Sequence, residues 1–355
     1  MNLYNKYRPI KFNDVAQPFV TTALKTQIIN NTHVSSYIFS GPSGVGKTTI
    51  ARIMAMALCC KYTKDGEPCG KCEDCISIIQ DRHRDVIEHN CAVSGGVDDM
   101  RTVIVENMII APISGWRIFI LDEAQLITMQ GQNSLLKTLE EPPPHVKFFI
   151  CTTEPNKILP AIQTRCQHFR LIPVSSKDII NILVNILNSE NIDTYEIDAL
   201  KLIAEHSNGS ARTAIVELER VIDLGVTEQN VRNMLGRGSR KLSLDLLLAI
   251  ANGNYGEVFH IIDMCKLTGI HMQSLFEESA NILLTVAKYK LKVIESVDDD
   301  ILIISKKYTG TQTMEVTAQL LEILSKIKQN IPEDLISSVY LLKTINKYKL
   351  SGKTK

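Results

Sequence analysis

Between residues 37 and 48 the sequence reads Tyr37-Ile38-Phe39-Ser40-Gly41-Pro42-Ser43-Gly44-Val45-Gly46-Lys47-Thr48, an apolar run that leads into a glycine-rich loop. A helical pattern follows from Thr49 to Leu58. A strand, a loop of this spacing and a helix form a P-loop, in which backbone N–H groups and the helix N-terminus hold phosphate. A glycine-rich turn that binds nothing is the alternative. We expect the loop to bind ATP through Gly41, Pro42, Ser43, Gly44, Val45, Gly46, Lys47 and Thr48.

A P-loop needs an acidic partner, and the apolar run that starts at Arg117 ends in Asp122 and Glu123. Lys47 supplies positive charge to the phosphates, and the Thr48 hydroxyl can bind Mg²⁺. At the end of a strand, Asp122 can hold the Mg²⁺ while Glu123 accepts a proton from the water that attacks the γ-phosphate. A solvated strand end is the alternative. The acid pair therefore favours ATP hydrolysis, with Lys47 and Glu123 as catalytic residues.

Length and composition leave room for two or three domains and exclude several classes of protein. The 355 residues carry 39 Lys and Arg against 39 Asp and Glu, so the chain is neither a strongly basic nucleic-acid binder nor an acidic disordered protein. No apolar run approaches the roughly 20 residues that span a membrane, and the N-terminus does not resemble a signal peptide. We therefore expect no membrane partner and a cytoplasmic, thiol-reducing location.

The order of strand and helix patterns predicts an α/β fold with a parallel sheet and helices on both faces. Strands are expected at 37–40, 85–90, 117–121 and 147–153. From about Pro173 onward strand signals disappear, and apolar residues recur at helical spacing. Turn signals place domain boundaries near Leu171 and Gly238. We expect three domains, namely a P-loop ATPase core at 1–171, a small helical domain at 172–238 and an all-helical domain at 239–355.

Five of the nine cysteines fall within one short stretch that follows the P-loop helix. Disulfides are rare in a reducing compartment, and four thiolates suit tetrahedral Zn²⁺. The spacing favours a structural zinc knuckle at about 59–76. Its expected ligands are Cys60, Cys69, Cys72 and Cys75.

Several alternatives to this zinc site remain open. Cys59 competes with Cys60 for the fourth ligand position, and His83 and His89 are weaker candidates. Redox chemistry at Cys69-Gly70-Lys71-Cys72, or free buried thiols, would also account for the cluster.

Further motifs resemble the ATPase subunit (gamma/tau) of the bacterial DNA polymerase III clamp loader, which is an AAA+ ATPase. The resemblance covers nearly the whole chain and includes the P-loop, the acid pair and the four-cysteine insertion. The other matching stretches are Tyr7-Arg8-Pro9, Phe12, Asp14-Val15, Leu135 to Pro143, His145 to Phe148, Thr152-Thr153, Thr164-Arg165-Cys166 and Gly209-Ser210-Ala211-Arg212.

The resemblance implies roles for three further residues. Arg165 corresponds to an arginine finger that reaches the ATP of a neighbouring subunit, where it acts in catalysis. Arg212 corresponds to a second sensor in a helical lid at 172–238, and Ser210 can cap its helix. Thr153 is the first sensor of phosphate, and 239–355 becomes a collar that holds subunits together. Surface arginines and a strand-ending threonine are the ordinary alternatives.

The implied function is that of a motor in a clamp loader. Copies of the chain and subunits of the delta and delta-prime type form a ring, expected to be a pentamer. ATP binding opens a sliding clamp, and hydrolysis releases it on primer-template DNA. The location is then the bacterial cytosol and nucleoid, or the cytosol of an infected host for a viral gene. The chain ends after its third predicted domain, so it resembles the short, gamma-like form.

The sequence departs from the family at two places near the nucleotide. Ala124-Gln125 stand where the family usually has Val-His, and the stretch from Asp14 to Gln17 is one residue shorter than usual. Two other functions stay open. One is a stator-like, non-hydrolysing subunit of the delta-prime type, and the other is a different AAA+ ATPase that remodels DNA.

Overall fold

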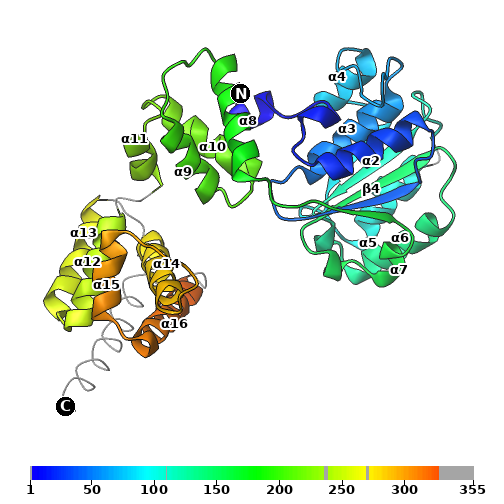
Figure 1. The fold of residues 1–355 in the computed structure, drawn as a ribbon. Helices are drawn as coiled ribbons and strands as arrows, with labels where there is room; N and C mark the ends of the chain where they lie inside the picture. Colours follow the sequence, from blue (N-terminus) through cyan, green and yellow to red (C-terminus); the bar gives the residue numbers. More distant parts are fainter. Residues whose placement is uncertain (1, 109, 236–238, 269–271, 328–355) are drawn as a thin grey trace. The chain divides into compact units, whose positions relative to one another are not determined.

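A five-stranded parallel sheet organises the first part of the chain in the computed structural model (Figure 1). Its strands are β1 (Ser36–Ser40), β2 (Val86–Asn90), β3 (Arg117–Asp122), β4 (Val146–Thr152) and β5 (Gln167–Arg170). They lie in the order β2-β3-β4-β1-β5. Four of them confirm the predicted strands to within a residue or two at each end. The fifth strand, β5, was not predicted.

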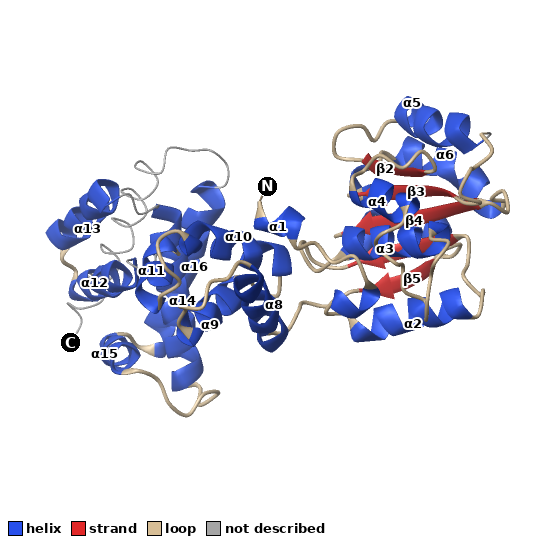
Figure 2. Cartoon of the chain, turned by 90° about the horizontal axis from the view of Figure 1, so that it is seen from above, coloured by secondary structure: helices blue, strands red, loops and turns tan. Residues whose placement is uncertain are grey.

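The three central strands β3, β4 and β1 are buried on both faces, as expected for parallel strands that carry continuous apolar runs. Phe39 and Ile120 belong to one core with Ile50 of α3. Ile38 and Phe119 belong to a second core with Leu135 of α6, on the opposite face. Figures 1 and 2 show helices on both faces. They are α2 (Pro18–Ile29), α3 (Lys47–Cys59), α5 (Val97–Met100), α6 (Met129–Glu140) and α7 (Pro160–Gln163), while α4 (Glu73–Ile79) packs on α3.

The structure describes residues 2–108, 110–235, 239–268 and 272–327. Two compact units divide the chain, at 1–228 and 229–355. The first unit contains the sheet and the helices that follow β5. These helices are α8 (Ser176–Ser189), α9 (Ile197–His206), α10 (Ala211–Ile222) and the start of α11 (Glu228–Met234). The short N-terminal helix α1 (Leu3–Lys6) contacts α10. The predicted boundary near Gly238 lies outside the described residues, and the three-domain division stays a prediction.

The second unit has a helical core of its own. Its helices are α12 (Ser239–Asn252), α13 (Tyr255–Thr268), α14 (Met272–Lys290), α15 (Asp299–Lys307) and α16 (Gly310–Ile327). Leu246, Phe276 and Leu320 are among its buried residues. The described part of the chain from Pro173 onward is built of helices, as predicted. Within the described residues, no helix is both long and apolar enough to cross a membrane.

Candidate nucleotide site and metal centre

A cavity of 710 Å³ lies at the carboxyl end of β1 and β3, within the first unit. Three parts of the chain line it. The P-loop and the acid pair form one wall, residues 4–10 and 13–16 form another, and side chains of α8 and α10 form the third. Ligand sites of open α/β folds lie at this end of the strands. The cavity brings together Lys47, Thr48, Asp122, Glu123 and Arg212 of the predicted site.

The P-loop has the backbone shape that a phosphate cradle requires. Gly46, which caps α3, has φ of 106°, a conformation that residues with a Cβ rarely adopt. The Nζ atom of Lys47 donates hydrogen bonds to the carbonyls of Gly41 and Pro42, at 2.9 and 2.8 Å. Lys47 is buried, and burial lowers its pKa. The negative charge of a bound polyphosphate would therefore favour the protonated form of Lys47.

Thr48 and Asp122 meet at the expected position for a magnesium ion. Thr48 Oγ1 donates a hydrogen bond to Asp122 Oδ2 across 2.9 Å, which joins the first turn of α3 to the end of β3. A hydroxyl and a carboxylate oxygen are hard ligands of the kind that Mg²⁺ prefers. These two side chains fit the ion, and Asp122 Oδ1 also accepts a hydrogen bond from the backbone N–H of Glu123 at 3.0 Å.

Glu123 occupies an unusual backbone conformation, with φ of 52° and ψ of 42°. This left-handed region is energetically unfavourable for residues other than glycine, and such outliers occur at functional sites. The conformation follows from the abrupt end of β3 and the start of the 3-10 turn Ala124–Leu126. It places the Glu123 carboxylate beside Gln125, whose Nε2 atom lies 2.5 Å from Glu123 Oε2.

Thr153 follows the last residue of β4 and does not line the cavity among the described residues. Its backbone N–H donates to Gln125 Oε1 at 3.2 Å, and the hydroxyl of Thr152 donates to the same oxygen at 2.8 Å. The predicted first sensor is therefore linked to Glu123 through Gln125.

Arg212 lies in the first turn of α10, where the expected cap by Ser210 is confirmed. Its backbone N–H lies 3.5 Å from the carbonyl of Gly44. The guanidinium lies over the ring of Tyr4, 4.7 Å from the ring centroid. α10 thus begins directly against the P-loop, with Arg212 held at the cavity by an aromatic ring.

Arg165 lies away from the cavity, two residues after α7. It forms an ion pair with Glu140 at 2.5 Å, and its NH1 atom donates to the carbonyl of Ala161 at 2.6 Å. Both partners of the ion pair are partly solvent-exposed, with 33% and 50% of the side-chain surface accessible. Such pairs contribute little to stability, so the guanidinium can exchange Glu140 for another anion.

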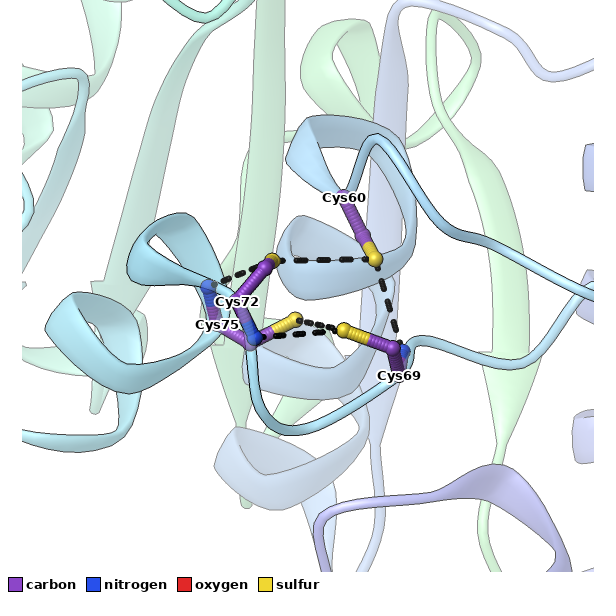
Figure 3. A group of neighbouring side chains, drawn as sticks. All are labelled: Cys60, Cys69, Cys72 and Cys75. Atoms are coloured by element: carbon purple, nitrogen blue, oxygen red, sulfur yellow. Dashed lines mark hydrogen bonds between the residues drawn. The ribbon is translucent and has the colours of Figure 1, made fainter.

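The four predicted cysteine ligands form one cluster (Figure 3). The Sγ atoms of Cys60, Cys69, Cys72 and Cys75 all lie within 4.8 Å of one another. The distance from Cys69 to Cys75 is 4.0 Å and that from Cys72 to Cys60 is 3.9 Å. Four sulfurs around one Zn²⁺ lie about 3.8 Å apart when each Zn–S bond is about 2.3 Å. The spacing is therefore compatible with zinc.

Backbone hydrogen bonds favour a thiolate at Cys69, whereas burial raises the pKa of the Cys72 and Cys75 thiols. The N–H groups of Lys71 and Cys72 point to Cys69 Sγ at 3.4 and 3.3 Å. Hydrogen bonds from this backbone, that of Lys71 first, lower the pKa of the Cys69 thiol to about 6. Cys59 is outside the cluster, and burial raises its pKa to about 12. Cys60 caps the C-terminal end of α3, so the P-loop helix runs directly into the cluster.

Sequence reasoning did not identify Tyr4 or Gln125 as site residues. Tyr4 lies three residues before the Tyr7-Arg8-Pro9 stretch but belongs to no motif, and only the folded chain places its ring under Arg212. Gln125 carried one signal, its position two residues after Glu123 at a departure from the family pattern. The contacts of α8 with the cavity had no sequence signal, because Asn181 and Asn185 belong to an ordinary helical pattern.

Comparison with known proteins agrees with this geometry. A family model described as "DNA polymerase III, delta subunit" matches residues 16–175. DNA polymerase III subunit gamma of Buchnera aphidicola (subsp. Baizongia pistaciae) is 35% identical over 300 residues, which cover 83% of this chain and 80% of that protein. DNA polymerase III subunit tau of Escherichia coli K12 is 37% identical over 294 residues, 81% of this chain. This chain spans 45% of the length of that tau subunit.

Solved structures give a weaker likeness. The RuvB Holliday junction branch migration motor of Thermotoga maritima superposes with a TM-score of 0.46 at 17% identity, and the match covers 79% of this chain and 94% of that one. The matches to the gamma and tau subunits each cover more than four-fifths of this chain. The chain belongs to the DNA polymerase III gamma/tau family.

Proposed function

We propose that the chain is an ATP-hydrolysing motor of a sliding-clamp loader. One observation carries the proposal: Lys47, Thr48, Asp122 and Glu123 line a single cavity that the first turn of α10 also lines. A nucleotide in that cavity meets the P-loop and the lid together. Binding and release of its γ-phosphate can then be converted into movement of the lid.

The residues in and around the cavity have separate roles in the proposed reaction. The loop from Gly41 to Thr48 and the N-terminus of α3 hold the phosphates, and Lys47 contributes charge. Thr48 and Asp122 hold Mg²⁺, which neutralises charge that develops on the phosphate oxygens. Glu123 orients the attacking water and accepts its proton. Thr153 and Arg212 are the first and second sensors of the γ-phosphate.

Arg165 acts on the nucleotide of a neighbouring subunit. Its position outside the cavity and its exposed ion pair with Glu140 support this role. A planar fork of donors can bind phosphate oxygens in two places at once, and the Glu140 pair is weak enough to be exchanged. Hydrolysis then depends on assembly, because an isolated subunit lacks an arginine from its neighbour.

The family supports a ring as the working form. We propose copies of this chain with subunits of the delta and delta-prime type, five subunits in all, with the helices of the second unit as the collar. The ring opens a sliding clamp on binding ATP and releases it on primer-template DNA after hydrolysis. Its location is the bacterial cytosol and nucleoid, or the cytosol of an infected host. Zinc at the four cysteines has a structural role, because four sulfur ligands leave no open position.

ATP turnover and clamp loading by the purified complex test the proposal. Lys47→Ala should abolish both while the thermal unfolding temperature stays within a few degrees of the wild type. Lys201→Ala is a matched control, because this exposed lysine pairs with Asp198 on α9 and neither residue lines the cavity. Normal clamp loading by Lys47→Ala would overturn the motor assignment.

A stator-like subunit of the delta-prime type is the second candidate, because the family model that matches residues 16–175 is described for a delta subunit and not for gamma/tau. Such a subunit binds no nucleotide productively and needs neither Lys47 nor Glu123. Glu123→Gln distinguishes the two. If the wild-type complex hydrolyses ATP and the Glu123→Gln complex binds ATP without hydrolysing it, the chain is not a stator.

A further inference from the structure

Gln125 is the central member of a hydrogen-bond chain that crosses the site. Its Nε2 atom donates to Glu123 Oε2 at 2.5 Å, and its Oε1 atom accepts from the Thr152 hydroxyl at 2.8 Å and the Thr153 N–H at 3.2 Å. One side chain thus connects the acid at the end of β3 with the end of β4. A glutamine suits this position because its amide donates on one side and accepts on the other.

The far end of this chain is fixed to the P-loop. Thr152 is fully buried, and its hydroxyl also accepts a hydrogen bond from the backbone N–H of Glu154 at 3.1 Å. The carbonyl of Thr152 accepts from the backbone N–H of Gly41 at 3.2 Å. The contacts therefore run from Glu123 through Gln125 and Thr152 to the first residue of the phosphate-binding loop.

Glu123 needs such a support. Its backbone is in the left-handed region at the end of β3, and the residues after it form only a single 3-10 turn. Gln125 holds Glu123 Oε2 by a hydrogen bond. The second carboxylate oxygen, Oε1, has no hydrogen-bond partner in the described part of the chain and can accept one from water. A water molecule bound by Oε1 would then have a defined position relative to the P-loop.

We propose that Gln125 is a positioning residue, which fixes the Glu123 carboxylate relative to the P-loop so that it can activate water. The inference rests on the proposed function. It predicts that loss of the Gln125 amide slows the chemical step and leaves nucleotide binding intact, since Gln125 does not line the cavity among the described residues.

The test is steady-state ATP hydrolysis, with ATP affinity measured separately, on the complex that co-purifies with the tagged full-length chain. Gln125→Leu keeps the approximate volume and removes both hydrogen bonds. It should lower kcat by about 10- to 100-fold, the range that follows from a small misplacement of a catalytic group, and change the Kd for ATP by less than about twofold. Gln125→Glu, of nearly identical shape, replaces the donor by a carboxylate beside Glu123 and should lower kcat at least as much.

Two further variants separate positioning from a general structural effect. Gln125→His keeps one donor and one acceptor and should recover a large part of kcat. Gln130→Leu, an exposed glutamine on α6, is the matched control and should keep the kcat of the wild type. Combined with Glu123→Gln, the Gln125→Leu change should lower the residual rate by no more than about twofold, because the residue it positions has lost its function.

The outcomes distinguish this inference from the proposed function. A wild-type complex without ATP turnover overturns both. A wild-type complex whose turnover requires Glu123 but is unchanged by Gln125→Leu and Gln125→Glu overturns the inference alone. Two other results also overturn it. One is that Gln125→Leu lowers kcat by the same factor with Glu123 and with Glu123→Gln, and the other is that a rise in the Kd for ATP accounts for the whole loss of activity.

Discussion

The hydroxyl of Thr48 and the carboxylate of Asp122 form a 2.9 Å hydrogen bond between the first turn of α3 and the end of β3. The two groups come from segments 74 positions apart, and neither alone would hold a divalent ion. Their contact brings together the two side chains that we propose as ligands of Mg²⁺.

Thr48→Val tests that site. The substitution keeps the shape of the side chain and removes the oxygen, so Mg²⁺ loses one ligand. We expect ATP affinity in the presence of Mg²⁺ to fall by roughly tenfold, the effect of losing about 1.4 kcal/mol. Affinity in excess EDTA should be the same for both proteins. An equal loss with and without Mg²⁺ would show that Thr48 contacts the nucleotide rather than the ion.

Metal analysis of two cysteine variants tests the zinc cluster. Cys72→Ser removes one of four sulfurs and should reduce the zinc content from about one equivalent to well below half. Unfolding of the first unit should begin several degrees lower, because metal binding contributes to folding. Cys59→Ser is the control next to Cys60 in sequence and should keep its zinc. Loss of zinc in both variants, or in neither, would contradict the ligand set.

The two arginines should separate binding from turnover. Arg165→Lys keeps the charge but loses the fork of donors, so turnover by the complex should fall by about 10²-fold or more while the isolated chain binds ATP normally. Arg212→Ala should instead weaken ATP relative to ADP, since Arg212 lines the cavity. The Kd values of isolated chains for ATP and for ADP distinguish these two roles. Weaker ATP binding by isolated Arg165→Lys would contradict a role in trans.

The buried pair of Asp85 and Arg117 predicts a pH dependence of stability. Burial opposes ionisation of Asp85, but hydrogen bonds from Ser114 and Ile113 and the charge of Arg117 outweigh it and lower its pKa. A lowered pKa in the folded state gives stability that is present above the unfolded pKa of about 3.9 and is lost as pH falls further.

Urea unfolding between pH 3 and pH 7 measures this effect. Asp85→Asn should cost about 3–5 kcal/mol at pH 7, because it leaves a buried arginine unpaired. The difference between the two proteins should shrink below about pH 4. A difference that stays constant with pH would show that the charge of Asp85 does not contribute.

Sequence reasoning recovered the elements whose signal is local. The P-loop, the acid pair and the four cysteines are each defined by spacing, and the folded chain brings each group together as predicted. β5 was missed because Gln167–Arg170 is a polar edge strand in which Phe169 is the one buried residue. Such a strand lacks the apolar run that identified the other four.

Contacts between distant segments had no such signal. The ring of Tyr4 reaches Arg212 only because α1 packs on α10, 208 positions away by residue number. The left-handed conformation of Glu123 likewise follows from how β3 ends, and nothing in its residue type predicts it. Gln125 could be noticed as a departure from a family pattern, but its role depended on where β4 ends.

The approach of α10 to the P-loop restricts which substitutions the loop can accept. A Cβ added at Gly44 would lie 2.0 Å from Ser210 Oγ and 3.2 Å from the Cβ of Arg212. Any larger residue at this position would therefore hinder both the backbone conformation, with φ of 77°, and the close approach of the first turn of α10 to the loop. A change at Gly44 could leave the phosphate-binding backbone in place and still disturb the contact between the loop and α10.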